Sequence, residues 1–171
     1  ATTRAPGPMP EHRPICTANR NLLAASVLVD ELVRCGLRDV CISPGSRSAP
    51  LTLAFARRDD VQRHVHVDER SAAFFALGLA RAARRPVALV CTSGSAAANY
   101  HPAVMEAFET GVPLLVLGAN RPPRLVDTGA NQTSEQAGLF GPHVLRFQPI
   151  GLPRPDGAWL RWLRGRVCRL V

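Results

Sequence analysis

The sequence predicts an α/β fold in which a mainly parallel sheet lies between two layers of helices. Short apolar runs of strand length alternate with segments of helical periodicity, which is the pattern of a parallel sheet covered on both faces. The chain has 171 residues, 46% hydrophobic and 20% charged, which is enough to bury a core without disulfides or a structural metal. We therefore expect one three-layer α/β/α domain, at residues 17–171.

The N-terminal segment differs in composition from the rest of the chain. Prolines at positions 6, 8, 10 and 14 and a scarcity of large apolar residues predict a flexible lead-in over residues 1–16. The first helix follows it, because apolar residues from Leu22 to Val33 recur at helical spacing. Gly36 is a typical helix stop.

Four strands and three further helices are expected next, in alternation. An apolar run predicts a strand at 40–43, and a helix at 49–58 follows its polar Pro-Gly loop. A second strand is expected at 64–67 and a helix at 70–84. Residues 86–92 and 113–118 are apolar throughout, as in strands buried on both faces, with a helix at 95–110 between them.

The pattern is weaker after residue 118. We expect a long loop, a short helix at 134–140, a last strand at 144–150 and a closing helix at 157–171. The closing helix has apolar residues on one face and arginines on the other. It is either a helix that lies on a membrane surface or a domain-closing helix with a solvated face, and the second interpretation is favoured.

The charge is strongly basic. There are 21 basic and 13 acidic residues, the net charge is +8, and every basic residue is arginine. Arginine binds carboxylate or phosphate through two hydrogen bonds, so this charge suits anionic small molecules or nucleic acid, although a plain preference for arginine also explains it. The sequence has no apolar run of about 20 residues that would span a membrane, and its start lacks the layout of a signal peptide.

The cysteines and histidines do not predict a metal site. Cysteines 16, 35, 41, 91 and 168 are widely spaced and form no CxxC pair, so neither a zinc site nor a thioredoxin-like dithiol is indicated. His64 and His66 share a face of the second strand, but no third ligand lies near them in the sequence. Free thiols are typical of a reducing compartment, and we expect a cytoplasmic protein.

Polar motifs follow the predicted strands at their carboxyl ends, where open parallel sheets bind ligands. They are Ser43-Pro-Gly-Ser-Arg-Ser48, Asp68-Glu-Arg70, Thr92-Ser-Gly-Ser95, and Asn120-Arg-Pro-Pro123 with Gly129-Ala-Asn-Gln132. If the strands are parallel, all of these motifs meet on one rim. That convergence is stronger evidence for a site than any single motif.

Each motif also has a purely structural interpretation. The loop at 43–48 is either a turn with a serine cap or an anion site that uses Arg47, and it is neither a P-loop nor GxGxxG. Residues 92–95 are either an ordinary helix cap or a ligand contact. Glu69 either stabilises a helix N-terminus or is a buried carboxylic acid placed for proton transfer.

Taken together, the motifs resemble the N-terminal, pyrimidine-binding domain of the SEPHCHC synthases (2-succinyl-5-enolpyruvyl-6-hydroxy-3-cyclohexene-1-carboxylate synthases, MenD). These are thiamine-diphosphate enzymes of menaquinone biosynthesis. The resemblance covers residues 17–155 and also rests on Ala49-Pro-Leu51, Ala96-Ala-Ala-Asn99, Arg124, Thr128 and Leu152-Pro-Arg-Pro155. The family decarboxylates 2-oxoglutarate and adds the succinyl-semialdehyde unit to isochorismate in a 1,4-addition.

The resemblance implies roles for particular residues. Glu69 matches the catalytic glutamate that hydrogen-bonds the aminopyrimidine ring and activates the cofactor. Thr92, Ser93 and Gly94 would line the pyrimidine pocket. The contacts to the dianionic substrate or the reacting centre would come from Ser46, Arg47, Arg121, Asn131 and Gln132. No residue of this chain is expected to bind a metal.

The chain departs from the family in one large respect. Family members are longer, and their C-terminal domain binds magnesium through a Gly-Asp-Gly motif, whereas Asp156-Gly157 lacks the preceding glycine. We therefore expect a fragment that holds half of a thiamine-diphosphate site and is inactive alone. Magnesium is expected in the missing domain, and the full enzyme is expected to be a homodimer or tetramer. Ser95 replaces the usual threonine and keeps the hydroxyl.

Two other functions stay open from the sequence. The pyrimidine domain of another thiamine-diphosphate carboligase, such as an acetolactate-synthase relative, would share the glutamate and the fold, but Ser46, Arg47 and residues 120–123 suit a dicarboxylate substrate better. A non-catalytic module that binds anions or nucleic acid fits the net charge of +8, but aromatic residues for base stacking are scarce. We expect small dianionic substrates as partners, with no nucleic acid and no membrane span.

Overall fold

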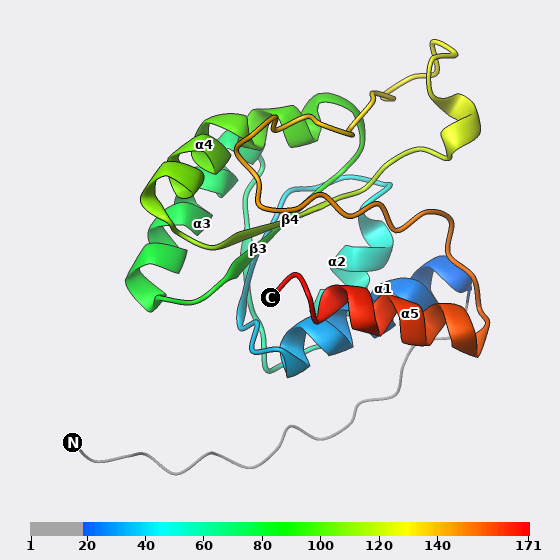
Figure 1. Ribbon diagram of the computed structural model, residues 1–171, viewed down its shortest axis with the longest axis horizontal. Coiled ribbons are helices and arrows are strands. Elements are labelled where there is room, and N and C mark those ends of the chain that lie inside the picture. The colour runs from blue at the N-terminus through cyan, green and yellow to red at the C-terminus, as the bar shows by residue number, and fades with distance from the viewer. Residues whose placement is uncertain (1–18) are drawn as a thin grey trace.

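A computed structural model describes residues 19–171, and it contains a parallel four-stranded sheet between two layers of helices (Figure 1). The strands are β1 (Asp39–Ile42), β2 (Gln62–Val65), β3 (Val87–Cys91) and β4 (Leu114–Gly118), in the spatial order β2-β1-β3-β4. Every strand pair is parallel. The three-layer α/β/α prediction is therefore confirmed. The lead-in expected at residues 1–16 lies outside the described residues.

Helices cover both faces of the sheet. The helices are α1 (Arg20–Arg34), α2 (Ala49–Ala56) and α5 (Gly157–Val167) on one face, and α3 (Glu69–Ala83), the 3-10 helix η1 (Gly94–Tyr100) and α4 (His101–Thr110) on the other (Figure 1). A further 3-10 turn, η2, spans Pro123–Leu125. Asn19 caps α1 by accepting hydrogen bonds from two backbone N–H groups at 3.0 Å, and Asp156 caps α5. None of the helices in residues 19–171 is long and apolar enough to cross a bilayer.

The two central strands are buried on both sides. Successive strand side chains point to opposite faces, so each strand contributes to two cores. The first core, under α1, α2 and α5, contains Val40, Ile42, Ala88 and Val90. The second, under α3, η1 and α4, contains Cys41, Val87, Leu89 and Cys91. The uniform burial of β1 and β3 explains why their sequences are apolar throughout.

The predicted helix at 134–140 is wrong. Gly138 and Gly141 have positive φ angles of 71° and 54°, which end any helical path. The backbone instead forms a turn, in which the Leu139 N–H donates to the Gln136 carbonyl at 3.2 Å. The Gln136 side chain donates to the Ala119 carbonyl at 3.0 Å and so ties this segment to the end of β4.

The predicted strand at 144–150 is also wrong. Val144 packs into the core under α3 and α4, whereas Ile150 packs into the core under α1, α2 and α5. The segment therefore passes from one face of the sheet to the other beside β4 (Figure 1), and it forms no ladder. Leu145 and Phe147, two apolar residues of this segment, are exposed.

The second strand begins two residues earlier than predicted, at Gln62. Its register is set where the Gln62 N–H donates to the Arg38 carbonyl at 2.8 Å. β2 lies at the edge of the sheet, so Val65 and Val67 are exposed. The predicted helix at 95–110 is likewise divided, into η1 and α4.

The two histidines near β2 have ordinary structural partners. The His64 ring nitrogen Nε2 lies 3.1 Å from a carboxylate oxygen of Asp39, which also pairs with Arg85 at 2.7 Å. The His66 ring packs on Phe75 with 4.7 Å between ring centroids. These contacts account for both side chains without a metal.

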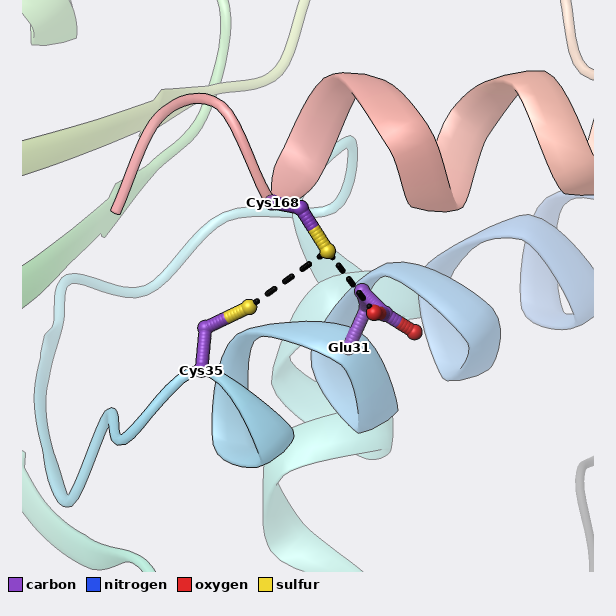
Figure 2. Close-up of side chains that lie close together, drawn as sticks. All are labelled: Glu31, Cys35 and Cys168. Carbon is purple, nitrogen blue, oxygen red and sulfur yellow. Dashed lines mark hydrogen bonds between the residues drawn. The ribbon is translucent and has the colours of Figure 1, made fainter.

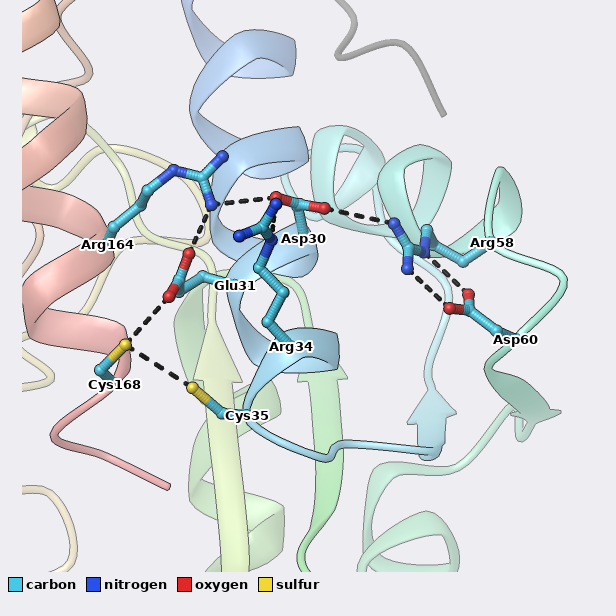
Figure 3. Close-up of polar contacts among 8 residues, drawn as sticks. All are labelled: Asp30, Glu31, Arg34, Cys35, Arg58, Asp60, Arg164 and Cys168. Carbon is cyan, nitrogen blue, oxygen red and sulfur yellow. Dashed lines mark hydrogen bonds and ion pairs between the residues drawn. The ribbon is translucent and has the colours of Figure 1, made fainter. Parts of the chain in front are cut away.

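A charged network joins the helices of the first face (Figure 3). Asp30 of α1 is 8% exposed, and its carboxylate pairs with Arg34 at 3.3 Å, Arg58 at 3.4 Å and Arg164 of α5 at 2.9 Å. Arg58 also grips Asp60 with two nitrogens, and these hydrogen bonds hold the pKa of Asp60 below its ordinary value. A buried carboxylate with several guanidinium partners is satisfied only while α1, α2 and α5 keep their places.

We predict that Asp30→Ala lowers the free energy of unfolding by about 3 kcal/mol, because it leaves the partly buried Arg58 and Arg164 without their shared carboxylate. Urea denaturation measures this change. Glu109→Ala, at an exposed position at the end of α4, is the control and should change stability by less than about 0.5 kcal/mol. Equal effects of the two substitutions would contradict this role for Asp30.

Candidate functional site at the carboxyl edge of the sheet

The chain leaves β1 and β3 in opposite directions. After β1 it runs to α2 on one face of the sheet, and after β3 it runs to η1 on the other. Two adjacent parallel strands whose connections diverge in this way form a switch point, where open α/β sheets bind ligands. The four polar motifs follow the carboxyl ends of four parallel strands, so they all lie along this rim.

The loop after β1 packs directly on the end of β3. The Ser43 N–H donates to the Val90 carbonyl at 2.9 Å and extends the pairing of the two strands. Gly45 lies so close to Thr92 that a Cβ at position 45 would stand 2.2 Å from the Thr92 Cβ. Only glycine permits this approach, which places the loop at 43–48 against the motif at 92–95.

The structural interpretation of this loop is correct in part. The Ser48 hydroxyl donates to the Gly45 carbonyl at 3.0 Å and closes the turn, but it does not cap α2. Ser46 and Arg47 are exposed on the outer side of the turn. Arg47 forms no ion pair within residues 19–171, so its guanidinium is available to an anion.

A second loop packs on the other side of the β3 motif. The Ser93 hydroxyl donates to the Gln132 carbonyl at 2.8 Å. Gly94 has a φ of 77°, and a Cβ there would meet the Gln132 Cγ at 2.9 Å. Asn131, Gln132 and Gly94 line an open hollow of about 750 Å³. The structure thus brings two predicted substrate contacts against two predicted cofactor contacts.

The two acids of the motif after β2 differ in their contacts. Asp68 caps α3 by accepting a hydrogen bond from the Ser71 N–H at 2.7 Å, and the hydrogen bonds from Ser71 hold the pKa of Asp68 below its ordinary value. Glu69 is half-buried and makes no side-chain hydrogen bond or ion pair within residues 19–171. Asp68 therefore provides the cap, while Glu69 lies in the first turn of α3, where a negative charge also stabilises the helix N-terminus.

The charge of Glu69 acts on two buried groups of the second core. Burial raises the pKa of the Cys91 thiol to about 12, and the Glu69 charge adds to this effect. Burial, the Cys91 thiol and the same carboxylate also raise the pKa of Tyr100. Tyr100 is the only tyrosine of the chain and is fully buried, and the sequence analysis missed it. Its position eight residues after Thr92 gave no signal that the charge of Glu69 would act on it.

Several buried polar atoms at this edge lack partners. Thr92 Oγ1 and Arg121 Nε are buried and have no hydrogen-bond partner within residues 19–171. The hydroxyls of Ser43 and Tyr100 approach one another, but their geometry falls short of a hydrogen bond. Because buried polar groups are normally satisfied, a hydroxyl and one guanidinium nitrogen without partners at one rim indicate a place for a polar ligand.

The chain matches a known protein family over most of its length. Residues 23–139 match the family described as thiamine pyrophosphate enzyme, N-terminal TPP binding domain. The chain belongs to this family. The matched range includes the whole sheet and every predicted site residue.

Relatives of this TPP binding domain carry a consistent name. The chain is 56% identical over 151 residues to a 2-succinyl-5-enolpyruvyl-6-hydroxy-3-cyclohexene-1-carboxylate synthase of Thermobifida fusca, covering 88% of this chain and 27% of that protein. A synthase of the same name from Haloarcula marismortui is 55% identical over 153 residues, covering 90% of this chain and 26% of that protein. The chain thus spans about a quarter of the length of these relatives.

A solved structure supports the fold. Benzoylformate decarboxylase from Polynucleobacter necessarius superposes with a TM-score of 0.63 at 20% identity, over 71% of this chain and 23% of that one. At this identity the likeness concerns the fold alone. It agrees with the parallel three-layer arrangement of the TPP binding domain.

We predict that Gly45→Ala destabilises the domain by about 1–3 kcal/mol, because the added methyl group overlaps Thr92. Thermal unfolding measures the change. Gly78→Ala in α3 is the matched control, since a Cβ there meets nothing within 4 Å and should stabilise the helix by about 0.5–1 kcal/mol. If Gly45→Ala is as stable as wild type, the loop does not rest on β3 as described.

Proposed function

We propose that this chain supplies the pyrimidine half of the thiamine-diphosphate site in a SEPHCHC synthase. That enzyme would decarboxylate 2-oxoglutarate and add the succinyl-semialdehyde unit to isochorismate. The observation that carries the proposal is Glu69, a half-buried carboxylate without a partner in residues 19–171, beside the switch point of a TPP binding domain. The names of the relatives at 55–56% identity support this particular reaction.

The residues at the rim fit the pyrimidine ring of the cofactor. Glu69 would share a proton with a ring nitrogen, which requires a dry site that a second domain would complete by covering the half-buried carboxylate. Thr92 offers an unpartnered hydroxyl, and Ser93 and Gly94 present backbone next to it. When bound, the cofactor supplies the carbanion-stabilising chemistry, and the protein holds and orients it.

The arginines of the rim fit dianionic substrates. Arg47 is exposed on the turn after β1, and Arg121 follows β4 with a buried nitrogen that lacks a partner in residues 19–171. A hydrogen bond to a charged group contributes about 1.5–3 kcal/mol, so two guanidinium groups would fix the carboxylates of isochorismate. Ser46, Asn131 and Gln132 would add neutral contacts to the same substrate or the reacting centre.

The remaining features of the enzyme are proposals that rest on the family. Magnesium and the diphosphate would be held by a further domain, so this chain provides half of the cofactor site and is inactive alone. The complete enzyme would be a homodimer or tetramer. The four described cysteines are free thiols, which supports a reducing, cytoplasmic location.

We predict that Glu69→Gln abolishes nearly all turnover in the longer protein that contains this chain, because an amide cannot share the required proton. The measurement is decarboxylation of 2-oxoglutarate with thiamine diphosphate, magnesium and isochorismate. Glu106→Gln, at an exposed position of α4, should retain full activity. If the Glu69→Gln protein keeps its activity, Glu69 does not have the proposed catalytic role. A wild-type protein that accepts pyruvate but not 2-oxoglutarate would favour an acetolactate-synthase relative instead.

We predict that Arg121→Met raises the KM for isochorismate at least about tenfold, the equivalent of about 1.4 kcal/mol, while leaving the unfolding midpoint nearly unchanged. Arg124→Met is the control, because Arg124 lies three residues away and is exposed. Steady-state kinetics and thermal unfolding of both variants test this. Equal KM values in the two variants would place the substrate elsewhere.

A further inference from the structure

A second cluster of reactive side chains lies away from the carboxyl edge (Figure 2). It consists of Glu31, Cys35 and Cys168, at the C-terminal ends of α1 and α5. α1 ends at Arg34, shortly before β1 begins at Asp39, so the cluster lies toward the amino edge of the sheet. It plays no part in the proposed function.

Helix geometry and packing bring the three side chains together. Glu31 and Cys35 are four residues apart, which places them on the same side of α1. Cys168 is the C-cap residue of α5, which packs against α1. The sequence separates the two cysteines by 133 residues, and for this reason their spacing did not indicate a metal site.

The distance between the two sulfurs suits a tetrahedral ion. The two sulfurs are 3.6 Å apart, and Cys168 Sγ lies 2.9 Å from Glu31 Oε1. All three ligand atoms lie within 4.8 Å of one another. A zinc ion bonded to both sulfurs at about 2.3 Å would subtend an S–Zn–S angle of about 103°, close to the tetrahedral value.

The glutamate is held by a neighbouring arginine. Arg164 of α5 binds Glu31 Oε2 and Asp30, so Oε1 is the oxygen that faces the sulfurs (Figure 3). Carboxylates that bind metals are typically fixed by such a second hydrogen bond. Burial alone would raise the pKa of Glu31, but the hydrogen bonds from Cys168 and Arg164 outweigh it and lower that pKa.

We propose that Glu31, Cys35 and Cys168 bind a thiophilic divalent cation of the zinc class and so join α5 to α1. Two thiolates and one carboxylate favour zinc over magnesium or calcium, which prefer oxygen ligands. Cys168 is exposed, so the fourth coordination position opens to solvent and takes water. The nearby Arg164 and Arg34 offset the negative charge of the three ligands.

Metal binding replaces the present hydrogen bonds by metal–ligand bonds. In the structure the Cys168 thiol donates to Glu31, and the Cys35 thiol donates to Cys168. As two sulfur–metal bonds form, the two thiol protons pass to the solvent. Because binding releases these protons, affinity for the cation rises with pH.

Titration of the reduced chain with Co²⁺ tests the site, because cobalt in a tetrahedral thiolate site absorbs strongly in the visible and near ultraviolet. All proteins carry Cys16→Ser, and a phosphine reductant keeps the thiols reduced. We expect one Co²⁺ per chain, displaced by Zn²⁺. Cys35→Ser and Cys168→Ser should lose the thiolate absorption, and Glu31→Gln should bind at least about tenfold more weakly. Cys41→Ala, which keeps both site thiols, should bind like the parent.

A second measurement separates metal binding from a folding defect. Zn²⁺ should raise the unfolding midpoint of the parent but not of Cys168→Ser, whose substitution lies at an exposed position. The proposal is overturned if the parent binds Co²⁺ no more tightly than Cys168→Ser, or if bound cobalt lacks thiolate absorption. It is also overturned if the reduced chain takes up no cobalt while the air-oxidised chain loses two thiols, because the pair would then be a disulfide.

Discussion

The pairing of β1 with β3 is the interaction on which the rest of the structure depends. Both strands are fully buried, and each contributes side chains to two separate cores. The chain leaves the two strands toward opposite layers, so their loops diverge at the carboxyl edge. There the backbone at Gly45 packs against Thr92, and the backbone at Gly94 packs against Gln132. The rim that holds the candidate site is thus a direct consequence of the strand order. The close packing of its loops requires glycine at these two positions.

Helix α1 stabilises the opposite side of the molecule through two adjacent acids. Asp30 gathers arginines from α1, the end of α2 and α5, whereas Glu31 faces the pair of thiols at the helix ends. Arg164 binds both acids and so couples the charged network to the sulfur cluster. The position of α5 therefore depends on polar contacts as well as on Leu163 and Val167 in the core. A bound cation would add a third kind of link between the same two helices.

Much of the fold follows from the sequence, because the apolar runs at β1 and β3 are unambiguous where both faces are buried. The run at β4 is equally apolar, although this edge strand is only half-buried and not fully buried as its sequence suggested. Prediction was less accurate at the edge strand β2 and failed at 134–150. The strand expected at 64–67 instead spans Gln62–Val65, and Val65 is exposed on this edge strand. At 134–150 the apolar residues pack singly into two different cores, so their spacing follows neither a helix nor a strand. The position of the polar motifs at the rim was predictable from the sequence. The burial of Tyr100, on which the charge of Glu69 acts, and the pairing of Cys35 with Cys168 were not, because they arise from long-range packing that residue spacing does not encode.

The most direct test of the central claim is a crystal structure of the longer protein with thiamine diphosphate bound. The account predicts the pyrimidine ring at the carboxyl edge between the loops that follow β1 and β3. The Glu69 carboxylate should lie within hydrogen-bonding distance, about 2.6–3.2 Å, of a ring nitrogen. A ring held by another acid, or a Glu69 side chain that points to solvent with the cofactor in place, would contradict the account.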